Sequence, residues 1–226
     1  MDLNFEQFFI KYEAVVEMAD NAFDKVRASH SECIKCKMHC ADCCHALFDL
    51  TLIEALYINN KVKEIFNDEK RSRLEEKANI ADRAVFKLKK KAFKEFESGK
   101  SEDEILKDMA TKRLRCPLLN EENKCDLYEF RPITCRLYGI PLSIGGTGHT
   151  CGISGFQEGK KYPTVNMDII QKKLYEISDA LVKSINSKYT KISEILVPVS
   201  MAILNDYDKE YLGIPDTEKS TDGKKE

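Results

Sequence analysis

Cysteine is the residue that most constrains this chain. Nine cysteines occur in 226 residues, and eight of them fall into two sets whose members are close in sequence. The first set is Cys36, Cys40, Cys43 and Cys44, and the second is Cys116, Cys125, Cys135 and Cys151. Thiols at such short spacings, in a chain without a secretion signal, favour metal binding over disulfides. All-cysteine sites select zinc or iron–sulfur clusters over hard cations such as magnesium or calcium.

Charge and hydropathy limit where in the cell the protein is expected to be and what it is expected to bind. The start of the chain, Met1 to Glu6, contains acidic residues and no apolar segment, so we expect no signal peptide. No apolar run approaches the roughly 18 residues of a membrane span. Lys+Arg (36) and Asp+Glu (38) nearly balance, so the chain has no excess of positive charge that would attract nucleic acid or an anionic membrane. We therefore expect a cytoplasmic protein with reduced thiols. Its partner is expected to be an unidentified protein or small molecule rather than nucleic acid or a membrane.

Most of the chain outside the cysteine sets has the apolar periodicity of amphipathic helices. The expected helices cover about residues 3–28, 51–65, 69–97, 101–110, 167–185 and 191–207. Thr51 with Glu54, and Ser101 with Glu104, have the spacing of a capping box. Gly99 is expected to end the long charged helix that precedes it. Strand signals are few, so the predicted fold class is mainly α, with irregular cysteine-rich metal-binding loops packed among amphipathic helices.

Two segments are expected to interrupt this helical pattern. Seven glycines lie between Gly139 and Gly159, so regular structure is not expected there. Pro198 is expected to kink or split the last helix. We predict one domain over residues 1–215, with its cysteine core at about 33–44 and 116–151. Residues 216–226 contain no apolar anchor and are predicted to form a disordered tail.

The adjacent pair Cys43–Cys44 bears on the kind of metal that is bound. Side chains of neighbouring residues usually point in different directions, so two adjacent thiolates on one small ion would need a strained chelate ring. We expect the pair to serve different iron atoms or different metals, or one of the two to bind no metal. This favours an iron–sulfur cluster over a single zinc site, and it leaves Cys33 as the spare thiol. Eight thiolates suffice for two four-ligand centres, or for one centre with spares.

Basic and imidazole side chains accompany the cysteines. Arginines beside the second set are expected to offset thiolate charge or to donate hydrogen bonds to sulfur, with surface solvation as the alternative. These are Arg113, Arg115, Arg131 and Arg136, of which Arg131 and Arg136 are the predicted cofactor-binding pair. A histidine can replace a thiolate ligand, and His39, His45 and His149 are placed for this. Enough cysteines are present to make cysteine ligation the better hypothesis.

Three other sequence patterns give weaker functional signals. Cys36-x3-Cys40-x2-Cys43 has the spacing of the cluster motif of radical S-adenosylmethionine enzymes, but Asp42 stands where those enzymes have an aromatic residue. The chain also lacks the repeating strand–helix pattern of their barrel. The glycine-rich stretch 145–148 lacks the Gly-Lys-Ser/Thr ending of a phosphate-binding loop. The lysine-rich run 87–94 is interpreted as a solvated helix face.

One string of residues resembles a known family. It runs Cys116-Pro117-Leu118-Leu119, then Cys125-Asp126-Leu127-Tyr128-Glu129-Phe130-Arg131-Pro132-Ile133-Thr134-Cys135-Arg136, after a CxxxCxxCC motif. Together, over about residues 33–151, these resemble the YkgJ-type cysteine-cluster family, which is described as zinc- or iron-chelating or as iron–sulfur-cluster-containing. The chain departs from the family at Ala41, where members have glycine, and in a charged insert at about 46–110; neither removes a candidate ligand.

The resemblance also suggests roles for two residues beside the cysteines. Pro132 would fix a turn before Cys135, and Arg131 would bridge a sulfur or a backbone carbonyl. A related cysteine pattern occurs in the flagellin lysine methylases, which implies, by analogy only, that such clusters can accompany methyl transfer.

The sequence thus predicts a metal-binding protein that holds an iron–sulfur cluster, or else zinc, through eight cysteines. A redox or protein-modifying role follows if the cluster does chemistry, as in an iron–sulfur oxidoreductase or a protein-modifying enzyme. The alternative is a zinc-stabilised structural or protein-interaction module. Metal trafficking or storage is a third hypothesis, which is disfavoured because thiols within an Arg-Pro framework suit one fixed centre.

Overall fold

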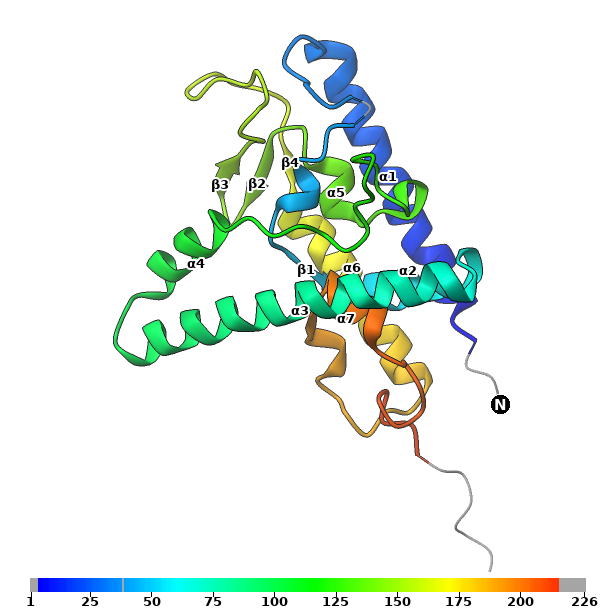
Figure 1. Ribbon diagram of the computed structural model, residues 1–226. Coiled ribbons are helices and arrows are strands. Elements are labelled where there is room, and N and C mark those ends of the chain that lie inside the picture. Colours follow the sequence, from blue (N-terminus) through cyan, green and yellow to red (C-terminus); the bar gives the residue numbers. More distant parts are fainter. Residues whose placement is uncertain (1–3, 38, 216–226) are drawn as a thin grey trace, which may run out of the picture.

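The computed structural model describes residues 4–37 and 39–215 (Figure 1). Its elements, in chain order, are α1 (Glu6–His30), η1 (Cys43–His45), β1 (Asp49–Thr51), α2 (Leu52–Ile65), α3 (Asp68–Glu97), α4 (Glu102–Ala110), η2 (Tyr128–Phe130), α5 (Ile133–Leu137), β2 (Leu142–Ile144), β3 (Thr147–His149), β4 (Val165–Asn166), α6 (Met167–Ser184), η3 (Ile192–Glu194), β5 (Leu196–Pro198) and α7 (Val199–Leu204). The predicted mainly α class is confirmed. The expected tail at 216–226 lies outside the described residues.

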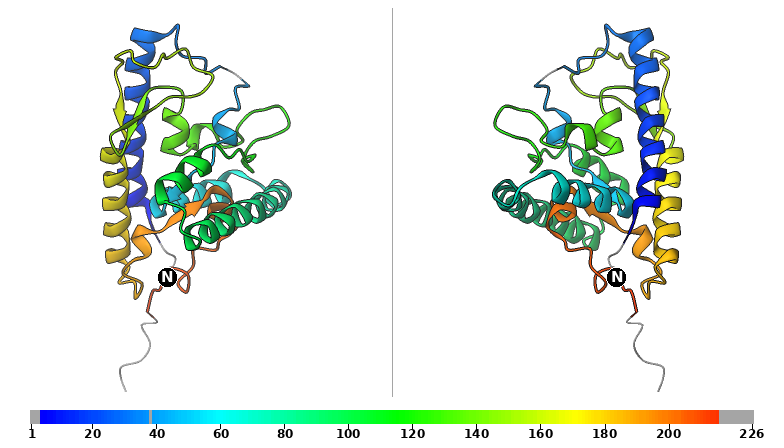
Figure 2. Two further views of the ribbon diagram at one scale, coloured as in Figure 1. Left: turned by 90° about the vertical axis from the view of Figure 1, so that its left-hand side faces the viewer. Right: turned by 90° about the vertical axis from the view of Figure 1, so that its right-hand side faces the viewer.

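The helices pack in two groups that share α2. Helix α1 lies against α5 and α6, and α7 lies against both α2 and α3. Figure 2 shows α1 and α6 side by side along one edge of the molecule, with α3 on the other side. One buried apolar cluster includes Tyr12 of α1, Ile53 of α2 and Leu181 of α6. Leu118 and Leu127, which flank cysteines of the second set, belong to the same cluster. The cysteine loops are therefore anchored in the core.

Local signals in the sequence explain the helix ends of the insert. Both predicted capping boxes are present, at Thr51 with Glu54 and at Ser101 with Glu104. Gly99 has a φ of +94°, and the amides of Gly99 and Lys100 donate to the carbonyl oxygens of Phe96 and Glu95 at 2.9 and 3.0 Å. This is the hydrogen-bond pattern of a glycine-terminated helix.

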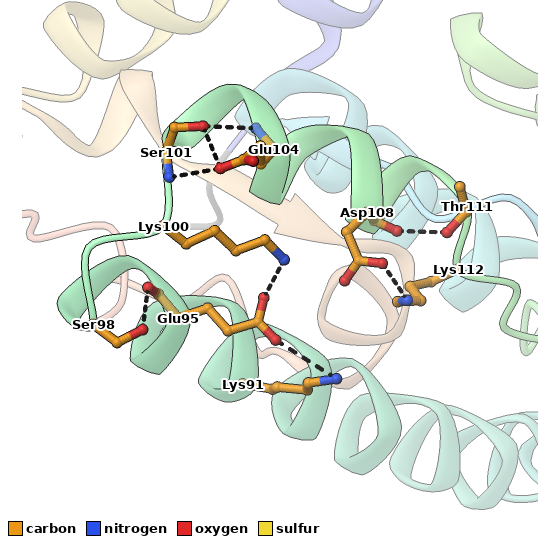
Figure 3. Close-up of polar contacts among 9 residues, drawn as sticks. All are labelled: Lys91, Glu95, Ser98, Lys100, Ser101, Glu104, Asp108, Thr111 and Lys112. Carbon is orange, nitrogen blue, oxygen red and sulfur yellow. Dashed lines mark hydrogen bonds and ion pairs between the residues drawn. The ribbon is translucent and has the colours of Figure 1, made fainter.

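An ion pair lies at the corner between α3 and α4, where Lys100 pairs with Glu95 at 2.7 Å (Figure 3). At the far end of α4, Lys112 pairs with Asp108 at 2.6 Å. The corner directs the chain from the long helix back toward the second cysteine set.

The glycine-rich segment is more regular than predicted. Strands β2 and β3 pair antiparallel, with Ile144 opposite Thr147. The two residues between them, Gly145 and Gly146, have φ values of +56° and +78°. Two residues with positive φ form the turn that suits the twist of a tight hairpin, and glycine adopts such values without steric cost. The expectation of irregular structure is therefore wrong for residues 142–149.

The predicted helix over 191–207 is also wrong. Residues 192–194 form η3, residues 196–198 form β5, and only 199–204 are α-helical. Pro198 ends the strand and is the N-cap of α7, so it divides the segment as predicted. The strand forms because Val197 pairs with Leu50 of β1, a partner far away in sequence. Among the described residues, no helix is both long enough and apolar enough to cross a membrane.

Candidate metal centre

Backbone hydrogen bonds hold the two cysteine sets next to each other. The amide of Cys116 donates to the carbonyl oxygen of Cys44 at 2.7 Å, and the amide of Leu114 donates to that of His45 at 3.0 Å. Ala46 and Arg113 form an antiparallel bridge just beyond them. The insert of α2, α3 and α4 therefore leaves and re-enters the cysteine region at neighbouring points.

Secondary structure places several of the thiols. Cys43 and Cys44 lie in the short helix η1, and Cys135 lies in α5, so these three are not in irregular loops as predicted. Cys116 and Cys125 lie on the two sides of a tight turn, closed by the bridge between Leu119 and Cys125. Cys151 follows β3. Its carbonyl oxygen accepts a hydrogen bond from the Ser154 amide at 2.9 Å.

Five sulfurs form an inner group: Cys43, Cys44, Cys116, Cys125 and Cys135. The sulfur of Cys43 accepts hydrogen bonds from the thiols of Cys135 and Cys44, which lowers the pKa of Cys43. The same contacts, followed by burial, raise the pKa values of Cys44 and Cys135. Cys116 and Cys125 lie close enough that their charges raise both of these pKa values further. Sulfurs from both sequence sets thus face one buried space.

Backbone hydrogen bonding lowers the pKa of three cysteines. It comes from Leu118 and Leu119 for Cys116, from Leu127 for Cys125 and from Ile153 for Cys151. Burial raises the pKa of Cys116 to about 12 and that of Cys125 to about 11, and these donors oppose the increase. Such N–H donors stabilise thiolates and help to set the properties of a bound metal.

Three further sulfurs form an outer group: Cys36, Cys40 and Cys151. Burial, then the charges of Cys40, Cys151 and Cys43, raise the pKa of Cys36 to about 11, so Cys43 of the inner group lies near this group as well. The thiol of Cys151 donates to Oδ2 of Asp42 at 3.4 Å. A hollow of about 640 Å³ opens beside this group, and Cys36, Cys40, Asp42 and His45 are among the residues that line it.

The arrangement changes one expectation about the adjacent pair. Cys43 and Cys44 were expected to point apart, but their sulfurs are hydrogen-bonded to each other and so face the same space. Both residues lie in the short helix η1. Within residues 4–37 and 39–215, no three His, Cys, Asp or Glu side chains already have the geometry of a metal-ion site. The donor chemistry fits zinc or iron, and the eight-cysteine ligand set stays a prediction.

The arginines make contacts that the sequence did not reveal. Arg136 is buried and donates to Asp20 of α1 at 2.6 Å and to the carbonyl oxygens of Arg131 and Glu129. It therefore joins α5 to α1 and shapes the chain before Cys135. Arg131 stacks on Tyr128, with its guanidinium carbon 4.0 Å from the ring centre. Its positive charge acts on Cys43 and Cys125, and in both cases lowers the pKa.

Arg113 and Arg115 contact oxygen atoms. Arg113 donates to Asp42 Oδ1 at 2.6 Å and to the Tyr138 hydroxyl at 3.1 Å. Arg115 donates to the carbonyl oxygen of Asn120 at 2.8 Å. Arg113 is thus linked to the outer group through Asp42.

The histidines and Cys33 have other contacts. Nδ1 of His39 lies 2.7 Å from the carbonyl oxygen of Glu122, and Nδ1 of His45 lies 3.0 Å from that of Ala41. His149 is exposed on β3. The thiol of Cys33 donates to the carboxylate of Glu32 at 3.6 Å. The assignment of Cys33 as the spare thiol stays a prediction.

Two supporting residues were missed by the sequence. Glu54 was recognised as a helix cap, but its second oxygen accepts the Ile133 amide at 3.2 Å, so one buried carboxylate holds the start of both α2 and α5. Gly139 lies against Cys36, because a Cβ added at Gly139 would lie 2.3 Å from the Cys36 sulfur. The capping-box spacing predicts the role of Glu54 at the start of α2 but not its bond to Ile133. No nearby sequence feature predicts that Gly139 lies against Cys36.

A comparison with protein families identifies the cysteine region. Residues 35–152 match the CxxCxxCC family, described as a putative zinc- or iron-chelating domain. The match covers more than half of the chain, so the chain belongs to this family. The expected resemblance to a cysteine-cluster, zinc- or iron-chelating family is thereby confirmed. No curated protein and no solved structure matches the chain significantly.

Proposed function

We propose that this CxxCxxCC protein holds an iron–sulfur cluster through its cysteines and uses it in a redox or protein-modifying reaction. The observation that carries the proposal is the inner group. It gathers sulfurs from both sequence sets around one space, and the adjacent Cys43 and Cys44 are both among them. A cluster with several iron atoms also takes four thiolates but spreads them over corners several ångströms apart, so that the adjacent Cys43 and Cys44 can bind different iron atoms.

The surroundings of the inner group support the same function. Amide donors reach Cys116 and Cys125, and hydrogen bonds to sulfur are one means by which a protein adjusts the potential of a cluster. The positive charge of Arg131 acts on two of the five sulfurs and offsets part of the negative charge of a thiolate centre. We place the protein in the cytoplasm, as one domain over residues 1–215; a reducing compartment suits its nine cysteines, which form no disulfide.

The second candidate is a zinc-stabilised structural or interaction module. Backbone hydrogen bonds from Cys116 and Leu114 join the two cysteine sets, and a structural zinc would hold the sets together more firmly. In that case one of the five inner sulfurs carries no metal.

Anaerobic purification distinguishes the two. An iron–sulfur protein should be brown, with broad absorbance near about 400 nm and acid-labile sulfide in proportion to iron. Cys33→Ser is the matched control, because it removes a thiol outside both groups. A colourless protein with stoichiometric zinc and no sulfide would refute the iron–sulfur proposal and support the structural module.

A further inference from the structure

The lysine-rich run of α3 carries exposed aromatic side chains as well as cations. Residues 83–94 contain six basic and no acidic residues, although the whole chain has a net charge of −2. Phe86 and Phe93 of this run are 63% and 61% exposed. They are seven residues apart, so they lie on the same side of the helix, about 10.5 Å apart along its axis. Lysines alone would keep this face solvated, so the two aligned phenylalanines need another explanation.

Four cations form a row beside the phenylalanines. They follow one another at steps of four, three and four residues, which places them along one side of α3; this basic row is Arg83, Lys87, Lys90 and Lys94. Nζ of Lys90 lies 5.9 Å from the centre of the Phe86 ring, so the row adjoins the phenylalanines. Within residues 4–37 and 39–215, no member of the basic row pairs with a carboxylate, whereas Lys89, on another side of α3, pairs with Asp49 at 2.6 Å.

The basic row and the two phenylalanines face away from the body of the protein. The other side of this part of α3 carries Val85, which is buried, and Leu88, which is partly buried. Helix α3 packs there on α7 and α4. Figure 1 shows the C-terminal half of α3 extending beyond α7, with α4 returning beside it. The exposed side is therefore an unpartnered helix face on an extended part of the molecule.

We propose that this face is the docking surface for an acidic amphipathic helix of a partner protein. Apolar side chains of the partner helix lie on Phe86 and Phe93, and its glutamates or aspartates pair with the basic row. Recognition between helices commonly uses anchors at i and i+7. Charges that flank such a strip select the partner and its orientation. The face lies outside the cysteine region, so the inference does not depend on which metal the cysteines hold.

The charge and width of the face argue against two other occupants. A second copy of the chain that used the same face would bring two basic rows together, and the like charges would repel. A helix that binds a membrane surface buries a broad apolar side. Phe86 and Phe93 instead form a narrow strip with cations directly beside it. An acidic partner helix fits both the narrow strip and the positive charge.

The test measures the fluorescence anisotropy of a labelled synthetic peptide during titration with the full chain. The peptide has about three heptads, with leucine at the a and d positions and glutamate at e and g. We expect it to bind, with a Kd that rises about tenfold between about 50 and 300 mM salt. The same peptide with lysine in place of glutamate should not bind, because its charge matches that of the basic row.

The contribution of the phenylalanines is measured with a double variant. Phe86→Ser with Phe93→Ser should weaken peptide binding at least about tenfold, because aromatic anchors supply much of the energy of such interfaces. Ile10→Ser with Ile169→Ser is the matched control, since it removes two comparably exposed apolar side chains from α1 and α6. The control should bind the peptide as the wild type does.

The contribution of the basic row is measured in the same way. Lys87→Gln with Lys90→Gln should weaken binding about tenfold at low salt and reduce its salt dependence. Lys25→Gln with Lys173→Gln removes two exposed lysines from α1 and α6 and should change neither. If the phenylalanine variant fails to fold, the lysine variant and its control decide.

Four results would overturn the inference. The first is an acidic peptide that does not bind, and the second is a control variant that loses as much binding as its partner variant. The third is tighter binding to vesicles of phosphatidylserine and phosphatidylcholine than to the peptide, which would assign the face to a membrane. The fourth is a dimer in sedimentation that the phenylalanine variant abolishes, which would assign the face to a second copy. Metal content of the same preparations tests the proposed function separately.

Discussion

Gly139→Ala should disconnect one cysteine from the outer group. The φ of Gly139 lies outside the left-handed region, so alanine imposes no backbone strain there. The only obstacle is the Cys36 sulfur, 2.3 Å from the added Cβ, with a ring carbon of Phe23 at 3.4 Å on another side. The perturbation is thus a single steric conflict at one candidate ligand.

The size of the conflict follows from these distances. Ordinary contact with a Cβ begins at 3.4 Å, so the sulfur or the backbone must shift by about 1.1 Å. Metal–ligand distances tolerate only about 0.2 Å. Cys36 therefore leaves the metal, and we expect outer-group affinity to fall about 10- to 100-fold. Overpacking itself should lower the free energy of unfolding by about 1–3 kcal/mol.

Metal content against a competing chelator measures the first effect, and thermal unfolding measures the second. Gly152→Ala is the matched control, because it adjoins Cys151 and a Cβ there meets no atom within 4 Å. If Gly139→Ala retained as much metal as Gly152→Ala, the outer group would not include Cys36. Loss of the inner metal as well would mean that the two groups are not separate.

Four further results are expected. Cys43→Ser or Cys135→Ser should abolish or sharply reduce the metal content measured by elemental analysis, while Cys33→Ser should not. Equal loss of metal in all three variants would contradict the assignment of Cys33 as the spare thiol. Glu54→Ala leaves the buried Ile133 amide without its acceptor and should lower the free energy of unfolding in urea by about 1–3 kcal/mol. Burial raises the pKa of Glu54 in the folded state, so the folded state binds more protons there than the unfolded state does. The stability contribution of Glu54 should therefore fall as pH rises above the unfolded glutamate value of about 4.3, and Glu54→Gln should remove that decline in urea titrations across pH. Ser101→Ala removes the cap of α4 and should cost about 1 kcal/mol, seen as faster amide exchange in α4, with metal content unchanged.

Features that depend on neighbouring residues could be predicted from the sequence. The two capping boxes and the helix end at Gly99 each involve residues within a few positions of one another, so spacing is sufficient. The Gly145–Gly146 hairpin was also within reach, because two adjacent glycines are a recognised signal for a tight turn.

Features that depend on distant pairing could not be predicted. The β5 strand exists because β1 pairs with it, and no property of residues 196–198 alone reveals that partner. The arrangement of the thiols likewise depends on how η1, α5 and the second set meet. The family motif supplied the candidate ligands, but sequence spacing does not specify which sulfurs share a space. Asp42 was noted only as a departure from another motif.

The meeting point of the two cysteine sets has a consequence for the order in which the protein matures. Bringing Ala46 and Arg113 together closes a loop of more than 60 residues, at an entropic cost of roughly 4 kcal/mol. The two backbone hydrogen bonds there contribute only about 1 kcal/mol each. The packing of α2 and α3 on α7 must offset most of this cost before any metal arrives. Metal would then enter a chain that has already folded, and chelator-treated protein should keep its helical circular dichroism. We therefore expect metal binding to follow folding rather than to drive it.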